Sequence, residues 1–182
     1  MSGHSKWAQI KHQKAATDAK KSKIFGKIAR AITIATREKG GDPVTNSSLR
    51  VIVEKARAVN MPRDNIERAI KKGAGDAGGI ALQEFTYEAY GPGGTALIIA
   101  GITDNNNRTS NEIKHLLSQY EAKWASPGSV LWAFQKKDGA WEALPYSEIE
   151  LKQSASEALY KLMDALDEHE DVQEIYANGK DA

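Results

Sequence analysis

Lysine and arginine side chains dominate the first 39 residues, where two aromatic rings and two histidines lie among them. Ten cations there face only two carboxylates, Asp18 and Glu38. Lysine and arginine neutralise phosphates, and an aromatic ring between them can stack on a base. The segment is therefore a candidate nucleic-acid-binding surface. Its candidate contact residues are Lys6, Trp7, Lys11, His12, Lys14, Lys20, Lys21, Lys23, Lys27, Arg30 and Arg37.

The same asymmetry extends over the whole chain of 182 residues. Residues 1–79 contain 17 Lys and Arg against seven Asp and Glu, whereas residues 80–182 contain eight against 17. The net charge of +1 hides this division. Opposite charge in two halves indicates one module that meets a polyanion and a second with another task. The alternative is a solvated arm whose charge only aids solubility.

A second polar run follows a buried apolar stretch in the acidic half. Asparagine and aspartate satisfy turns and helix caps, so a structural loop is the default interpretation. The alternative is a contact surface that forms hydrogen bonds with RNA or a protein. The residues of this possible second surface are Asp104, Asn105, Asn106, Asn107 and Arg108.

Residues for catalysis or for metal binding are not evident. The chain has no cysteine, which excludes disulfides, thiolate nucleophiles and cysteine–zinc sites. The four histidines lack metal-binding spacing, and no catalytic triad or carboxylate pair can be nominated. We therefore predict a protein that is not an enzyme and that needs no cofactor or metal. A nuclease that uses the acidic half and a pure protein-interaction adaptor are the alternatives.

The N-terminal sequence has no apolar core of a secretory signal, and no stretch reaches the ~18 apolar residues of a membrane span. We expect a cytoplasmic monomer that binds nucleic acid and no membrane.

Apolar spacing predicts three helices in the basic half. The first begins at Asp18 and stops at Gly40-Gly41, the second covers about 47–59, and the third runs from Pro62 to Gly73. We expect residues 1–17 to form a flexible basic arm and residues 18–72 a helical nucleic-acid-binding domain.

Residues 73–81 are rich in glycine and predict a linker. Beyond it, residues 82–178 alternate between strand and helix patterns. Strands are predicted near 85–89, 95–103, 129–134, 149–151 and 172–176, with helices after a Thr109–Glu112 capping box and over 155–168. The predicted fold class is α+β, with a basic three-helix domain and an α/β sandwich domain that has a mostly antiparallel sheet.

Several motifs in this chain resemble those of the YebC family. That family includes the PmpR-type regulators and the mitochondrial translational activator of cytochrome oxidase. The motifs are Gly3-His4-Ser5-Lys6-Trp7, Gly40-Gly41-Asp42-Pro43, Asn60-Met61-Pro62-Arg63-Asp64-Asn65, Tyr87-Glu88-Ala89-Tyr90-Gly91-Pro92-Gly93-Gly94, Asp104-Asn105-Asn106-Asn107-Arg108-Thr109 and Asp171-Val172-Gln173.

The resemblance implies a non-enzymatic, DNA-binding transcriptional regulator. It also allows a ribosome- or RNA-associated translation factor that relieves stalling at proline-rich stretches. In one respect the chain departs from the family pattern, because only about a dozen residues, 135–147, stand where the family inserts a third domain. We expect that domain to be absent and a hairpin around Asp138-Gly139 to replace it. The strands on either side should then close one sheet, with Trp132, Phe134 and Trp141 on a buried face of the hairpin.

Overall fold

The computed structural model describes residues 18–75 and 81–181, which form two compact units. The helical unit contains the described residues up to Gln83 together with Ile102–Asp104. The sandwich unit contains Glu84–Gly101 and the described residues from Asn105 onward. The predicted α+β class is confirmed by five α-helices and an antiparallel sheet in the described ranges. None of these helices is long and apolar enough to cross a membrane.

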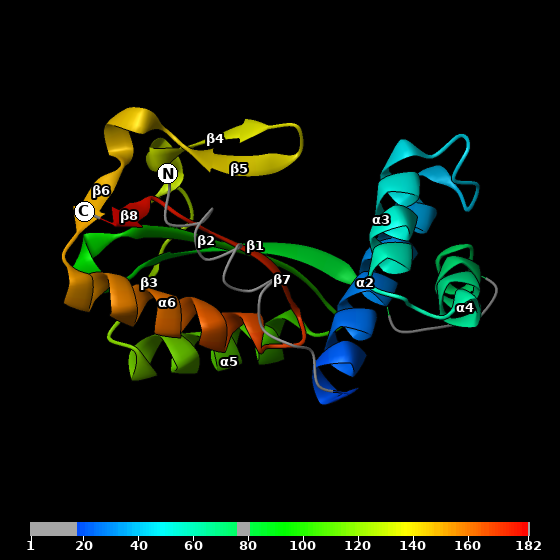
Figure 1. Ribbon diagram of the computed structural model, residues 1–182, viewed down its shortest axis with the longest axis horizontal. Coiled ribbons are helices and arrows are strands. Elements are labelled where there is room, and N and C mark those ends of the chain that lie inside the picture. The colour runs from blue at the N-terminus through cyan, green and yellow to red at the C-terminus, as the bar shows by residue number, and fades with distance from the viewer. Residues whose placement is uncertain (1–17, 76–80, 182) are drawn as a thin grey trace. The chain divides into compact units, whose positions relative to one another are not determined.

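Three helices make up the helical unit, α2 (Asp18–Lys39), α3 (Ser47–Ala58) and α4 (Arg63–Gly73), as Figure 1 shows. They match the three helices predicted from the apolar spacing, with ends that differ by one residue or none. Each helix buries one stripe, which is how short amphipathic helices become stable. The core contains Ile32, Ala35, Leu49, Val53, Ala56, Met61, Ile66 and Ala69.

Asn46 joins the end of α2 to the start of α3. Its side-chain oxygen accepts a hydrogen bond from the Leu49 backbone N–H at 3.0 Å, which caps α3. Its amide nitrogen donates to the carbonyls of Ala35 and Gly40, each at 2.8 Å. Because the side chain is fully buried, water cannot take the place of these three hydrogen bonds if they are lost.

A four-stranded sheet forms the centre of the sandwich unit. The strand order is β3 (Lys123–Ala125), β1 (Gln83–Tyr90), β2 (Ala96–Thr103) and β7 (Val172–Ala177). The pairs β1–β3 and β2–β7 are antiparallel. Both faces of β2 are buried, which explains its continuous apolar sequence.

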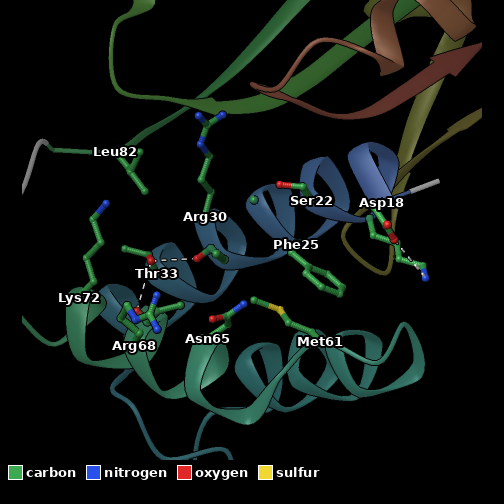
Figure 2. Close-up of a pocket in the computed structure, with 14 residues that line it drawn as sticks. Asp18, Ser22, Phe25, Arg30, Thr33, Met61, Asn65, Arg68, Lys72 and Leu82 are labelled. Carbon is green, nitrogen blue, oxygen red and sulfur yellow. Dashed lines mark hydrogen bonds and ion pairs between the residues drawn. The ribbon is translucent and has the colours of Figure 1, made fainter. Parts of the chain in front are cut away.

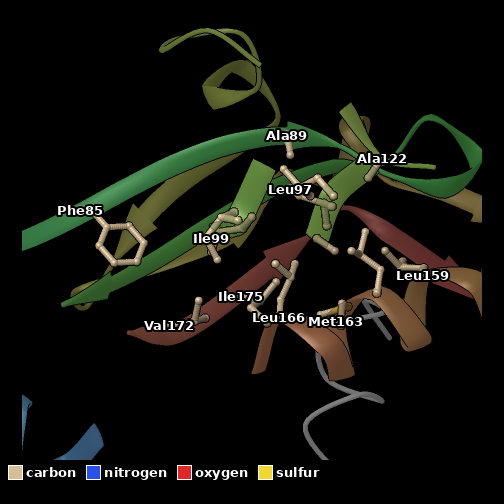
Figure 3. Packing of buried hydrophobic residues seen from close by; sticks show 14 of the residues in the cluster. Phe85, Ala89, Leu97, Ile99, Ala122, Leu159, Met163, Leu166, Val172 and Ile175 are labelled. Atoms are coloured by element: carbon tan, nitrogen blue, oxygen red, sulfur yellow. The ribbon is translucent and has the colours of Figure 1, made fainter. Parts of the chain in front are cut away.

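Helices cover one face of this sheet and a hairpin covers the other (Figure 1). The helices are α5 (Asn106–Gln119) and α6 (Gln153–Asp167), and Figure 3 shows residues of the core on this side. The hairpin consists of β4 (Phe134–Lys137) and β5 (Ala140–Ala143). A short parallel pair, β6 (Ile149–Leu151) and β8 (Gly179–Asp181), completes the unit.

The predicted hairpin turn is confirmed, because Asp138 and Gly139 both have positive φ, at 50° and 84°. The expectation that all these strands close one sheet is wrong, since β4 and β5 form a sheet of their own. Phe134 is buried and Trp141 packs against the same cluster. Trp132, expected on a buried face, has 55% of its surface exposed.

Two local predictions are corrected. Residues 129–134 are not one strand: a single 3-10 turn, Leu131–Ala133, precedes β4. The Glu88 carboxylate accepts the N–H groups of Gly128 (2.6 Å) and Val130 (2.7 Å), so this segment is fixed to a side chain and not to a neighbouring strand.

The Thr109–Glu112 capping box is also wrong. Asn105 caps α5, and its side chain accepts from the Arg108 backbone N–H at 3.1 Å. Thr109 lies inside the helix and is fully buried. Its hydroxyl donates to the Asp171 carboxylate at 2.6 Å, a partner 62 residues away.

Candidate nucleic-acid interface

The cations of α2 lie on two faces of that helix. Lys21 and Arg30 line a groove between α2 and α4. Lys20, Lys23 and Lys27 recur at three- and four-residue spacing and so share another face, and Arg30 continues that spacing at the edge of the groove. The row of cations predicted from the sequence therefore forms a stripe that meets the groove at Arg30, whereas Lys21 lines the groove outside that stripe.

The α2–α4 groove has a volume of about 560 Å³ and is drawn in Figure 2. Its lining residues recur every three or four positions along both helices, so each helix contributes one face. The lining consists of Asp18, Lys21, Ser22, Phe25, Gly26, Ala29, Arg30, Thr33, Met61, Asn65, Arg68, Ala69, Lys72 and Leu82.

The charged side chains of the groove are four cations and one carboxylate. Lys21 and Arg30 come from α2, and Arg68 and Lys72 come from α4. The carboxylate, Asp18, is fully exposed and lies 3.9 Å from the Lys21 ammonium, a separation at which solvent screens most of the attraction. A concave surface with this excess of positive charge attracts an anionic ligand.

The floor of the groove is apolar and well ordered by packing. Met61 and Ala69 belong to the helical core, and the half-buried Phe25 packs against it. The Thr33 hydroxyl lies 2.9 Å from the Ala29 carbonyl and 3.2 Å from the Ala69 carbonyl, which links α2 to α4. The groove thus combines a cationic rim with an apolar base.

Gly73 sets the distance between the two helices. A Cβ atom there would lie 2.5 Å from the Thr33 carbonyl oxygen and 2.6 Å from the Thr36 Cβ. Only a glycine permits this close approach. Gly73 was predicted to begin the linker, but it is the last residue of α4 and part of the helix packing. Residues 76–80 of that linker lie outside the described residues.

Gly26 lines the same groove for no such packing reason. It lies within the 22-residue α2, and apart from its chain neighbours and the adjacent helix backbone no described atom comes within 4 Å of the position that its Cβ would take. A glycine inside a helix costs about 0.5–1 kcal/mol relative to alanine. The helical unit gains no close contact in return.

The remaining predicted residues differ in their placement. Lys6, Trp7, Lys11, His12 and Lys14 lie outside the described residues. Arg37 uses one guanidinium nitrogen to donate to the Leu82 carbonyl at 2.6 Å. This bond fastens the segment after α4 to α2, so Arg37 has a structural task within the helical unit.

The polar run at the start of α5 also has internal tasks. Asn105 is the helix cap, and the Asn106 side chain accepts a hydrogen bond from the Tyr87 hydroxyl. The Arg108 guanidinium lies 2.7 Å from the buried Asp171 carboxylate and 3.7 Å from Glu112. Asn107 is exposed. These contacts agree with the interpretation of residues 104–108 as a structural loop. Their role as a surface that binds RNA or a protein stays a prediction.

Asp171 is the centre of this polar cluster. It is fully buried and accepts from both Arg108 and Thr109. Burial of the Tyr87 ring, followed by the negative charge of Asp171, raises the pKa of the Tyr87 hydroxyl. The His169 Nδ1 accepts the Asp171 backbone N–H at 3.2 Å, so its Nε2 carries the hydrogen that faces Glu112 at 2.9 Å.

Glu112, His169 and Asp171 also offer ligand atoms that lie within 4.8 Å of one another. The Arg108 guanidinium lies near both carboxylates, so one of the two negative charges of the cluster is offset by the protein itself. Sequence spacing did not reveal this group, because 57 residues separate Glu112 from His169.

Sequence reasoning also missed the α4 side of the groove. Arg68, Lys72 and Asn65 were not among the candidate contact residues, although their spacing already placed them on one face of α4. That this face meets Lys21 of α2 depends on how the helices pack, which the sequence does not state.

Comparison with known protein families gives two adjoining matches. Residues 5–76 match the TACO1/YebC protein N-terminal domain, and residues 82–139 match the TACO1/YebC second and third domain. A probable transcriptional regulatory protein of Thermosipho melanesiensis is 58% identical over 137 residues, which are 75% of this chain and 54% of the relative. One from Petrotoga mobilis is 54% identical over 150 residues, 82% of this chain and 59% of the relative.

The chain therefore spans little more than half the length of the curated relatives it matches. Among solved structures, a conserved hypothetical protein from Aquifex aeolicus has a TM-score of 0.85 and 30% sequence identity. That match covers 97% of both chains.

Proposed function

Because the chain belongs to the TACO1/YebC family, we propose that it is a non-catalytic regulator of gene expression that binds nucleic acid. The observation that carries this proposal is the α2–α4 groove, with its four cations, one carboxylate and apolar floor. In this proposal residues 1–17 and the helical residues 18–72 bind the polyanion in the cytoplasm. Residues 73–81 connect them to residues 82–178, where Asp104–Arg108 provides a second contact surface.

The relatives named probable transcriptional regulatory proteins support DNA as the target. A second candidate function is that of an RNA-associated translation factor, acting on the ribosome at proline-rich stretches. The concave shape of the groove favours this second candidate, since single-stranded RNA presents bases that can enter a recess.

Charge reversal on the groove tests the proposal. Arg68→Glu with Lys72→Glu removes two groove cations, both on exposed residues of α4. Lys152→Glu with Lys161→Glu makes the same change of charge on exposed residues of the sandwich unit and serves as the matched control. Affinity for labelled DNA and RNA is measured by fluorescence anisotropy over a series of salt concentrations.

The groove variant is expected to bind at least tenfold more weakly. The slope of log affinity against log salt should become shallower by about 1.4, since each single-strand phosphate that is no longer neutralised lowers the slope by about 0.7. The control should keep the wild-type slope, because it alters only long-range attraction. Equal slopes in the two variants would refute the groove as the binding surface.

A further inference from the structure

We propose that the α2–α4 groove holds an unstacked base of a single-stranded nucleic acid, an inference that rests on the nucleic-acid binding proposed above. The groove joins a half-buried aromatic ring to several cations in one recess. Proteins that bind single-stranded nucleic acid without sequence preference combine aromatic rings, on which bases stack, with cations that contact the phosphates.

Gly26 is the observation that places the ligand. It lies within α2 where glycine weakens the helix, and no described atom occupies the space above it. Among the reasons that glycine is used is the close approach of a ligand to the backbone. A base seated over Gly26 would account for a glycine that packing does not explain.

The shape of the site argues against a duplex. Proteins read duplex DNA with a convex element, such as a helix that enters a major groove about 12 Å wide. Here the recess belongs to the protein and is lined from both sides by helices (Figure 2). An unstacked base enters such a recess, whereas a base inside a duplex does not.

The lining residues supply the chemistry for each part of a nucleotide. Phe25 and Met61 offer an aromatic ring and a thioether beneath the base. Ser22 and Asn65 offer polar groups to its edge, and Lys72 offers a cation to the phosphate. RNA and DNA share this chemistry, so the proposal is for a single strand of either kind.

The experiment fills the groove and separately removes the base. Gly26→Leu places a large side chain in the recess, and Gly26→Ala places a single methyl group there, so the two variants fill it by different amounts while both remove the helix penalty of glycine. The probes are oligo-uridine and oligo-deoxythymidine of about 12 nucleotides, the same strands with abasic central positions, a duplex, and oligo-glutamate of equal charge. Affinity is read by anisotropy, and folding by thermal unfolding.

Removing the central bases is expected to weaken binding to the wild type by about tenfold, since stacking on an aromatic ring contributes about 1–3 kcal/mol per base. Gly26→Ala should show a smaller preference for the intact strand than the wild type does. Gly26→Leu should bind intact and abasic strands equally weakly while unfolding at the same temperature as Gly26→Ala or higher. A larger loss for oligo-uridine than for oligo-deoxythymidine would identify RNA as the source of the base, and the reverse would identify DNA.

If Gly26→Leu retains the preference for intact over abasic strands, base insertion is refuted while nucleic-acid binding stands. Tighter binding of the duplex than of either strand, or displacement by oligo-glutamate at equal concentration, also overturns the inference. If the wild type binds no nucleic-acid probe at low salt, the proposed function itself fails.

Discussion

Gly73→Ala tests the packing that forms the groove, and its effect should have the opposite sign from that of Gly26→Ala. Alanine at either helical position should gain up to about 0.5–1 kcal/mol of helix propensity. At Gly26 nothing described opposes the methyl group, so that variant should be more stable by about this amount. At Gly73 the methyl group would lie 2.5 Å from the Thr33 oxygen.

Forcing a methyl group into a filled site costs about 1–3 kcal/mol. The propensity gain at Gly73 is small because the residue ends α4. We therefore expect Gly73→Ala to destabilise the helical unit by about 1–2 kcal/mol. The two variants should differ by about 1.5–3 kcal/mol although the substitution is the same.

Hydrogen exchange is the suitable assay, because two units need not unfold together. Amides of α2 and α4 should exchange faster in Gly73→Ala and more slowly in Gly26→Ala, with no change in the sandwich unit. Urea unfolding followed by circular dichroism gives the free energies. If Gly73→Ala matches the wild type or exceeds it in stability, the close approach of the helices is wrong.

Three further predictions follow from single interactions. Asn46→Ala removes a helix cap and two buried donors, and should cost about 2–4 kcal/mol in urea unfolding; a cost below about 1 kcal/mol would contradict it. Arg108→Met leaves the Asp171 charge uncompensated by the guanidinium and should cost about 2 kcal/mol by the same assay, less than a fully buried pair because Arg108 is partly exposed. Burial raises the pKa of the Tyr87 and Tyr176 hydroxyls in the folded state above 10.0, their value in the unfolded chain. The stability that these two groups contribute is therefore fully present below pH 10.0 and should be lost as the pH rises from 10.0 through the folded-state pKa values. Unfolding free energies that do not change above pH 10.0 would refute this.

Local sequence signals predicted the helical unit well because its helix ends are fixed by nearby residues. Gly40, with φ of 86°, ends α2, and Pro62 precedes α4. The turn at Asp138-Gly139 is likewise local. In each case the chemistry of one or two adjacent residues determines the backbone.

Predictions failed where a distant side chain decides the structure. The segment before β4 is held by Glu88, 42 residues from Val130, and no local pattern shows this. Thr109 has the spacing of a helix cap, but Asp171 binds its hydroxyl and Asn105 takes the cap position.

The candidate site was predictable only in part, because its charges can be read from the sequence and its shape depends on helix packing. Charge density identified the basic half, including Lys21 and Arg30. The groove itself arises from the packing of α2 on α4, which depends on the close approach at Gly73. Composition indicated a polyanion ligand, whereas only the packed helices show a recess that a base could enter.

Photocrosslinking of a bound single strand to the intact chain, followed by mass spectrometry of the crosslinked peptides, shows whether the strand lies in the α2–α4 groove. Crosslinks are expected on peptides of α2, α4 and the segment before α4 that contain Phe25, Asn65 or Met61, and they should disappear when Gly26→Leu replaces the wild type. Crosslinks confined to residues 81–181, with none on α2 or α4, would contradict this placement.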